Sequence, residues 1–109
     1  MTRHVAVARR LGARLRGLLG RATLPTGEAL LIRPCGAIHT IGMRFALDVR
    51  FFDRRGALVR EVLGVRPGRW CVWGGWCAAC VLECAAGDAA FAGVKHLDEV
   101  VGRSWWKED

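Results

Sequence analysis

The chain has 109 residues, 52% of them hydrophobic, and a formal net charge of +7 at pH 7. This length allows one hydrophobic core, and the apolar fraction excludes a disordered chain. No run reaches the roughly 18 apolar residues that a membrane-spanning helix needs, and the arginine-rich N-terminus lacks the apolar stretch of a secretory signal. We therefore expect one domain over residues 1–109, located in the cytoplasm and without a membrane span.

The N-terminal third predicts a strand, a helix and a second strand. Residues 4–8 (HVAVA) alternate in hydrophobicity, as half-buried strands do. Leucines in residues 11–19 are spaced to lie on one face of a helix, and residues 24–27 favour a turn. Residues 29–33 (ALLIR) then predict a short apolar strand that ends at Pro34.

The most informative stretch covers residues 32–56, IRPCGAIHTIGMRFALDVRFFDRRG. A constrained connection at its start leads into a short extended segment at residues 38–43. The β-branched and aromatic run at 48–53 predicts a strand, and residues 53–56 (DRRG) predict a hairpin turn to a second strand at 57–65. Reactive side chains therefore gather where a strand begins.

The last third predicts short elements around one buried strand. Residues 66–69 favour a loop, and residues 77–84 (CAACVLEC) predict the buried strand. Asp88 is suited to cap a brief helix through Ala92, and residues 98–101 predict a final strand. Residues 102–109 are expected to form a C-terminal tail.

Four ordered motifs resemble one known family. Residues 34–59, PCGAIHTIGMRFALDVRFFDRRGALV, are similar to the central signature of the family of unknown function 192 (DUF192, also uncharacterised protein family 0127). Residues 16–21 (RGLLGR), 81–87 (VLECAAG, with two substitutions) and 93–98 (GVKHLD, with Leu97 where glycine is usual) resemble its other motifs. The resemblance covers about residues 5–101, and the Trp- and Cys-rich segment 70–80 departs from the family's pattern.

The resemblance implies a compact, mainly β (α+β) domain. Its expected form is a jelly-roll-like or barrel-like antiparallel β domain with one helix near the N-terminus. No established activity comes with the family, so the resemblance names no reaction, ligand or cofactor.

The central stretch contains the candidate ligand-binding residues Cys35, His39, Thr40, Met43, Arg44 and Asp48. Cys35, His39 and Asp48 are the residue types of a thiol nucleophile, its base and an orienting carboxylate. We favour a structural interpretation, in which Asp48 accepts hydrogen bonds from loop amides, His39 satisfies a carbonyl and Cys35 fills a small pocket. A ligand-binding cleft in which the side chains of His39, Thr40 and Asp48 meet is the second interpretation, and catalysis is the third.

Four of the five cysteines lie close together in the sequence, at Cys71, Cys77, Cys80 and Cys84. Their spacing, C-x5-C-x2-C-x3-C, matches neither a zinc ribbon nor a ferredoxin. On one strand Cys77 and Cys80 would lie about 10 Å apart on opposite faces. We therefore expect no metal and no cofactor; a metal site would need both residues in a turn after Gly74-Gly75. Cys80 and Cys84 would share a buried face with Leu82.

Trp70, Trp73 and Trp76 recur at every third residue around Gly74-Gly75. Buried indoles would cover the end of the sheet as core, which is the interpretation we favour. Exposed indoles would form a platform for bases or sugars. Exposure of even one of them would make this loop a binding surface.

The function that the sequence favours is a noncatalytic binding or accessory module with a candidate cleft around His39 and Asp48. Its expected partner is an unknown small molecule or protein. One alternative is a thiol-dependent enzyme that uses Cys35, His39 and Asp48. The other is a basic nucleic-acid-binding protein, although the arginines are scattered and predict nonspecific binding to polyanions more directly.

Overall fold

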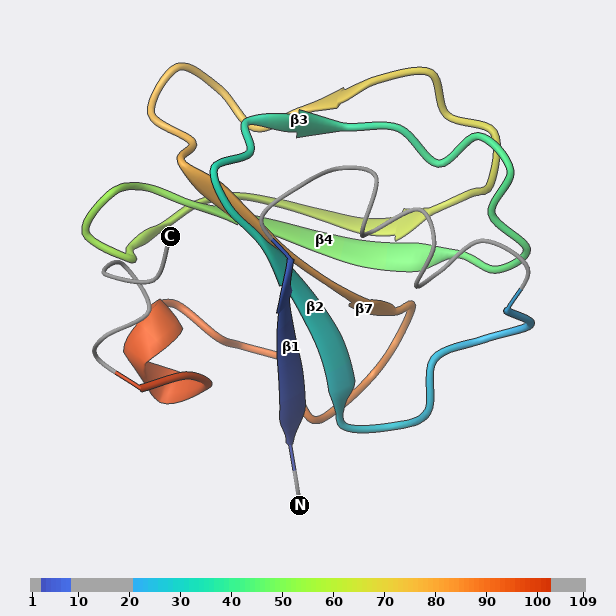
Figure 1. The fold of residues 1–109 in the computed structure, drawn as a ribbon, viewed down its shortest axis with the longest axis horizontal. Coiled ribbons are helices and arrows are strands. Elements are labelled where there is room, and N and C mark those ends of the chain that lie inside the picture. Colours follow the sequence, from blue (N-terminus) through green and yellow to red (C-terminus); the bar gives the residue numbers. More distant parts are fainter. Residues whose placement is uncertain (1–2, 9–20, 103–109) are drawn as a thin grey trace.

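The computed structural model describes residues 3–8 and 21–102, and Figure 1 shows their arrangement. The strands in these ranges are β1 (His4–Ala8), β2 (Glu28–Ile32), β3 (Ala37–Ile38), β4 (Leu47–Phe52), β5 (Leu58–Val65), β6 (Val72–Trp73) and β7 (Cys80–Ala85). A single turn of 3₁₀ helix, η1, covers Leu97–Glu99. The helix predicted over residues 11–19 lies outside the described residues, as does the tail from residue 103.

Five strands form one mixed sheet in the order β1-β2-β7-β4-β5. β1 and β2 are parallel, and all other neighbours in this sheet are antiparallel. Because β1 and β5 lie at opposite edges, the sheet is open within the part of the chain that the structure describes. The predicted mainly β fold is confirmed, whereas this topology does not confirm the barrel-like or jelly-roll-like antiparallel form.

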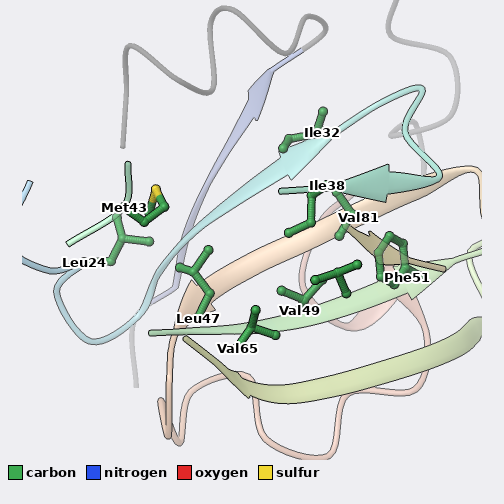
Figure 2. Close-up of a cluster of buried hydrophobic side chains, with 10 residues drawn as sticks. Leu24, Ile32, Ile38, Met43, Leu47, Val49, Phe51, Val65 and Val81 are labelled. Atoms are coloured by element: carbon green, nitrogen blue, oxygen red, sulfur yellow. The ribbon is translucent and has the colours of Figure 1, made fainter. Parts of the chain in front are cut away.

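β3 and β6 pair antiparallel in a separate two-stranded sheet that covers one face of the larger sheet (Figure 1). The core between the two sheets contains Leu47, Val49 and Phe51 from β4 together with Ile38 and Val72 from the covering strands. Figure 2 shows this core, with Met43 and Leu24 near one end and Phe51 toward the other. We call this side of the large sheet the first face.

The opposite, second face of the large sheet packs against the segment that follows β7. Cys80, Leu82 and Cys84 point to this face and contact a cluster that includes Phe91 and Leu97. Figure 1 shows η1 on the side of the sheet away from β3. The prediction that Cys80, Leu82 and Cys84 share one buried face is therefore confirmed, and all six residues of β4 are buried because both faces are covered.

The hairpin predicted after residue 53 is present between β4 and β5. Asp53 Oδ1 accepts hydrogen bonds from the backbone N–H groups of Arg55 (2.8 Å) and Ala57 (3.0 Å). Gly56 has a φ of 88°, in the left-handed region that favours glycine. The turn is thus fixed by its own residues.

Three predictions for the last third need correction. The strand predicted from Cys77 begins at Cys80, because Trp76 and Cys77 form a turn after Gly75, which has a φ of 98°. The predicted helix at 88–92 is a series of turns, although Asp88 still accepts a hydrogen bond from the N–H of Ala90 (2.9 Å). The strand predicted at 98–101 is replaced by η1, which a reciprocal pair of hydrogen bonds caps at its start.

Candidate functional site

Thr40 is fully buried and holds the loop that precedes β6. Its hydroxyl donates to the carbonyl of Arg66 (2.7 Å) and accepts from the N–H of Arg69 (2.9 Å). Its backbone carbonyl accepts from the N–H of Gly68 at 2.8 Å. Thr40 therefore fixes residues 66–69 against the segment after β3, and its hydroxyl is used inside the protein.

Asp48 joins the ends of two neighbouring strands. The residue is 5% exposed; its Oδ1 accepts from the N–H of Gly64 (2.8 Å) near the end of β5, and its Oδ2 accepts from the N–H of Gly87 (2.9 Å) just after β7. The prediction that Asp48 accepts hydrogen bonds from loop amides is confirmed for Gly87, whereas Gly64 belongs to β5. Both carboxylate oxygens accept hydrogen bonds from amides. Asp48 therefore does not serve as the carboxylate that would orient His39 in a thiol-dependent enzyme.

The large sheet separates Asp48 from the other candidates of the central stretch. Asp48 pairs with Cys84 in the register of β4 and β7 and shares its second face. Met43 is part of the core on the first face, and half-buried Cys35 packs against that core while its thiol donates to the carbonyl of Ala37 (3.1 Å). The structure therefore does not bring the Asp48 side chain together with Thr40 and its neighbours.

His39 and Arg44 differ in exposure, and the Nδ1 atom of His39 is buried. His39 is half-buried at the end of β3, and Arg44 is exposed.

The two buried cysteines are unsuited to nucleophilic chemistry. Burial raises the pKa of the Cys80 thiol to about 12. Burial likewise raises the pKa of Cys84 to about 11, although the positive charge of Arg50, whose guanidinium lies 3.6 Å from the Cys84 sulfur, opposes part of this shift. Because the thiolate is the reactive form, both residues are inert at neutral pH.

The three tryptophans around Gly74-Gly75 are at the surface, so the prediction that they form core is wrong. Trp70 is 81% exposed, Trp73 46% and Trp76 93%. Val72 and Gly74 occupy the inward positions on either side of Trp73, and a side chain on Gly74 would collide with the ring of Phe51. Phe51 already fills the space beneath this segment, which leaves the indoles outside.

A cavity of about 470 Å³ lies beside Trp76, where the β4–β5 turn approaches the turn after Gly75. It is lined by Asp53, Arg54, Arg55, Trp76, Cys77, Ala78 and Ala79. The predicted residues Cys35, His39 and Asp48 line neither this cavity nor a second one of about 380 Å³ beside β1 and β2.

The charge around the cavity at Trp76 is positive. Arg54 and Arg55 are exposed, and neither has an ion pair with another residue in the described ranges. The carboxylate of Asp53 is engaged by two backbone amides of its own turn. Trp73 and Trp76 contact each other edge to face, with ring centroids 5.2 Å apart. We call Arg54, Arg55, Trp70, Trp73 and Trp76 together the Trp–Arg surface.

The cysteines do not assemble a metal site in the described part of the chain. A metal site would need both Cys77 and Cys80 in a turn after Gly74-Gly75; Cys77 lies in such a turn, whereas Cys80 begins β7. Among the described residues, no group of three or more His, Cys, Asp or Glu side chains is placed to hold an ion. Cys71 and Cys77 are exposed, whereas Cys80 and Cys84 are buried on the second face.

The chain belongs to the family DUF192, described as "Uncharacterized ACR", which matches residues 1–102. Comparison with curated proteins finds no match. Within the described ranges, no helix has the length and apolarity required to cross a membrane.

Two solved structures share the fold. One is a protein of unknown function from Novosphingobium aromaticivorans, with a TM-score of 0.73, 20% sequence identity, and coverage of 86% of this chain and 71% of that chain. The other is a putative transcription regulator from Sinorhizobium meliloti, with a TM-score of 0.71, 21% identity, and coverage of 84% and 75%. At this level of identity the likeness shows the fold alone.

Proposed function

We propose that this DUF192 protein is a noncatalytic, single-domain binding module of the cytoplasm, and that its ligand binds at the Trp–Arg surface. The exposure of Trp76 in the lining of a positively charged cavity, with exposed Trp73 in contact with it, carries this proposal. Large rigid aromatic side chains and arginine are enriched among the residues that dominate binding energy. Indole surface in contact with water is also unfavourable unless a ligand covers it.

The chemistry of the surface defines the kind of ligand. The exposed ring of Trp76 offers an apolar, flat wall, and Arg54 and Arg55 offer positive charge at the same cavity. A ligand with a planar apolar part and a negative group would satisfy both. Arginine also binds carboxylates and phosphates through paired hydrogen bonds.

Catalysis by the central stretch has less support. A Cys35–His39 pair would lack the carboxylate that orients the base, because Asp48 accepts hydrogen bonds from Gly64 and Gly87 instead. The central stretch is the second candidate for ligand binding, without Asp48, whose side chain lies on the second face of the sheet. Exposed Arg44 and half-buried His39 are its remaining contact groups.

An aromatic monoanion, 8-anilinonaphthalene-1-sulfonate, provides a direct test of the proposed surface. We expect saturable enhancement of its fluorescence with the folded wild-type protein. Trp76→Ala and the double variant Arg54→Ser/Arg55→Ser should each weaken binding at least fivefold. Cooperative thermal unfolding of each variant would show that the dye does not report a loosened fold.

The matched controls lie on β5 and do not line the cavity. Leu63→Ala removes an exposed apolar side chain, and Arg60→Ser removes an exposed arginine. Both should bind the dye like the wild type. If Trp76→Ala binds normally while His39→Ala does not, the ligand site lies in the central stretch and the proposal is wrong.

A further inference from the structure

The aromatic part of the Trp–Arg surface is suited to stacking. Trp76 is 93% exposed and touches Trp73 edge to face, so a broad ring face of Trp76 is open to a flat partner. Trp70 is 81% exposed and lies outside the lining of the cavity. The surface therefore offers flat apolar groups at more than one place, which suits a ligand with repeated planar units better than one small molecule.

Positive charge accompanies the indoles along the same segment. Arg54 and Arg55 lie at the cavity beside Trp76, and exposed Arg69 directly precedes Trp70. Asp53 is the one acidic residue in the cavity lining, and amides of its own turn engage its carboxylate. Interleaved arginine and tryptophan match a polymer in which planar groups alternate with negative charges.

We infer that the Trp–Arg surface binds single-stranded nucleic acid, with bases stacked on the tryptophans and phosphates held by the arginines. This inference rests on the proposed function and names its ligand. Base faces are accessible in a single strand, whereas in a duplex they are covered by neighbouring bases. Stacking on aromatic side chains is tolerant of sequence, so the surface would bind many sequences with similar affinity.

Two other occupants fit the observations less well. A duplex groove is read by a helix or a two-stranded ribbon that enters it. The described elements beside these tryptophans are the two-residue pair β3–β6 and the turn of the β4–β5 hairpin, whose strand β4 is buried in the sheet. An anionic membrane surface also attracts tryptophan and arginine. The hollow beside Trp76, with its charged rim, is a shape that a flat membrane surface would leave unfilled.

The test measures fluorescence anisotropy of fluorescein-labelled dT12 and U12 oligonucleotides at 50 and 150 mM NaCl. We expect saturable binding of at least one of them that persists at 150 mM NaCl, with quenching of tryptophan emission. Trp76→Ala and Trp73→Ala should each weaken binding about tenfold. Arg54→Ser/Arg55→Ser should lower the slope of log affinity against log salt by about 1.4, the value for two lost contacts to a single strand.

Leu63→Ala and Arg60→Ser again serve as matched controls and should bind like the wild type. An abasic oligonucleotide of the same length and charge separates stacking from simple attraction between charges. Equal affinity for the abasic strand and dT12 would overturn the inference, because the bases would then contribute nothing. Tighter binding to a dodecamer duplex would overturn it as well.

Three further outcomes show which of the inference and the proposed function stands. If the anionic dye binds at Trp76 and neither oligonucleotide binds, the inference fails and the proposed function stands. If phosphatidylglycerol vesicles bind and shift tryptophan emission to the blue while the oligonucleotides do not bind, the partner is a membrane surface and the inference fails. If dye and oligonucleotides bind and neither responds to Trp76→Ala, both proposals fail.

Discussion

Removal of the Asp48 carboxylate should lower the free energy of unfolding by about 2–3 kcal/mol. Asp48 is 5% exposed, and its two oxygens accept hydrogen bonds of 2.8 and 2.9 Å from Gly64 and Gly87. Hydrogen bonds to a charged group contribute about 1.5–3 kcal/mol each, which would give about 3–6 kcal/mol for the pair. Gly64 and Gly87 are exposed, so their released amides can bind water and recover part of this loss.

Equilibrium unfolding in urea, followed by circular dichroism, measures the effect for Asp48→Ala. Asp48→Asn should lose less, because its one carbonyl oxygen can still accept one of the two bonds. His39→Ala should cost less than Asp48→Ala, because His39 is half-buried and is a candidate for ligand contact. Asp98→Ala controls for loss of negative charge; Asp98 is exposed, its ion pair with His96 (3.7 Å) lies at the surface, and the loss should stay within about 0.5 kcal/mol.

Two results would refute this reasoning. Wild-type stability of Asp48→Ala would mean that the two amide bonds contribute nothing, so that Asp48 does not hold the strand ends together. A larger loss for His39→Ala than for Asp48→Ala would make His39 a structural residue. The cleft of the central stretch would then lose its main ligand contact.

Three further predictions concern packing and the thiols. Gly74→Ala should destabilise the protein by about 1–3 kcal/mol in thermal unfolding because its methyl group meets the Phe51 ring, whereas Gly102→Ala, in open space, should have little effect. Stability in urea should fall as pH rises above 9, by up to about 1.4 kcal/mol per pH unit for each thiol. The reason is that the folded-state pKa values of Cys80 and Cys84, about 12 and 11, lie above the ordinary value of 9.0. Cys84→Ala should therefore make the fall in stability with pH less steep. The chain has no tyrosine whose titration would overlap with that of the thiols. Ellman's reagent should label exposed Cys71 and Cys77 quickly and the two buried thiols only on unfolding; fast labelling of all of them in the folded protein would contradict the packing of the second face.

The sequence predicted the elements that depend on nearby residues. β4 and β5 follow from hydrophobic and β-branched runs on either side of a turn whose own Asp53 and Gly56 fix its shape. β1 and β2 follow from short apolar runs at 4–8 and 29–33. The order of the strands and the parallel pairing of β1 with β2 depend on distant contacts, which no local pattern contains.

The role of Asp48 shows why sequence distance misled the prediction of a cleft. Asp48 is nine positions from His39, yet strand alternation points its side chain to the second face of the sheet. Its partners Gly64 and Gly87 lie 16 and 39 positions away. A pattern of residue types could predict that Asp48 binds amides, and only the fold decides which amides.

One feature of the sequence could have predicted that Trp73 is exposed. Alternation in β6 places Val72 and Gly74 on one side and Trp73 on the other, which marks Trp73 as outward if the Val72 side is the core. The deciding fact is tertiary, because Phe51 from β4 occupies the space beneath Gly74. With that space filled, the indoles have no place in the core.

The central stretch and the Trp–Arg surface are physically connected. The Thr40 hydroxyl accepts from the N–H of Arg69, the residue before Trp70, and the carbonyl of Gly36 accepts from the N–H of Gly74, the residue after Trp73. Gly36 and Thr40 of the central stretch thus hold the tryptophan-bearing segment at Arg69 and Gly74. The central stretch supports this segment, and residues 70–76 carry the exposed indoles. It follows that relatives with the same central stretch and a different segment at this place need not share the ligand proposed for this chain.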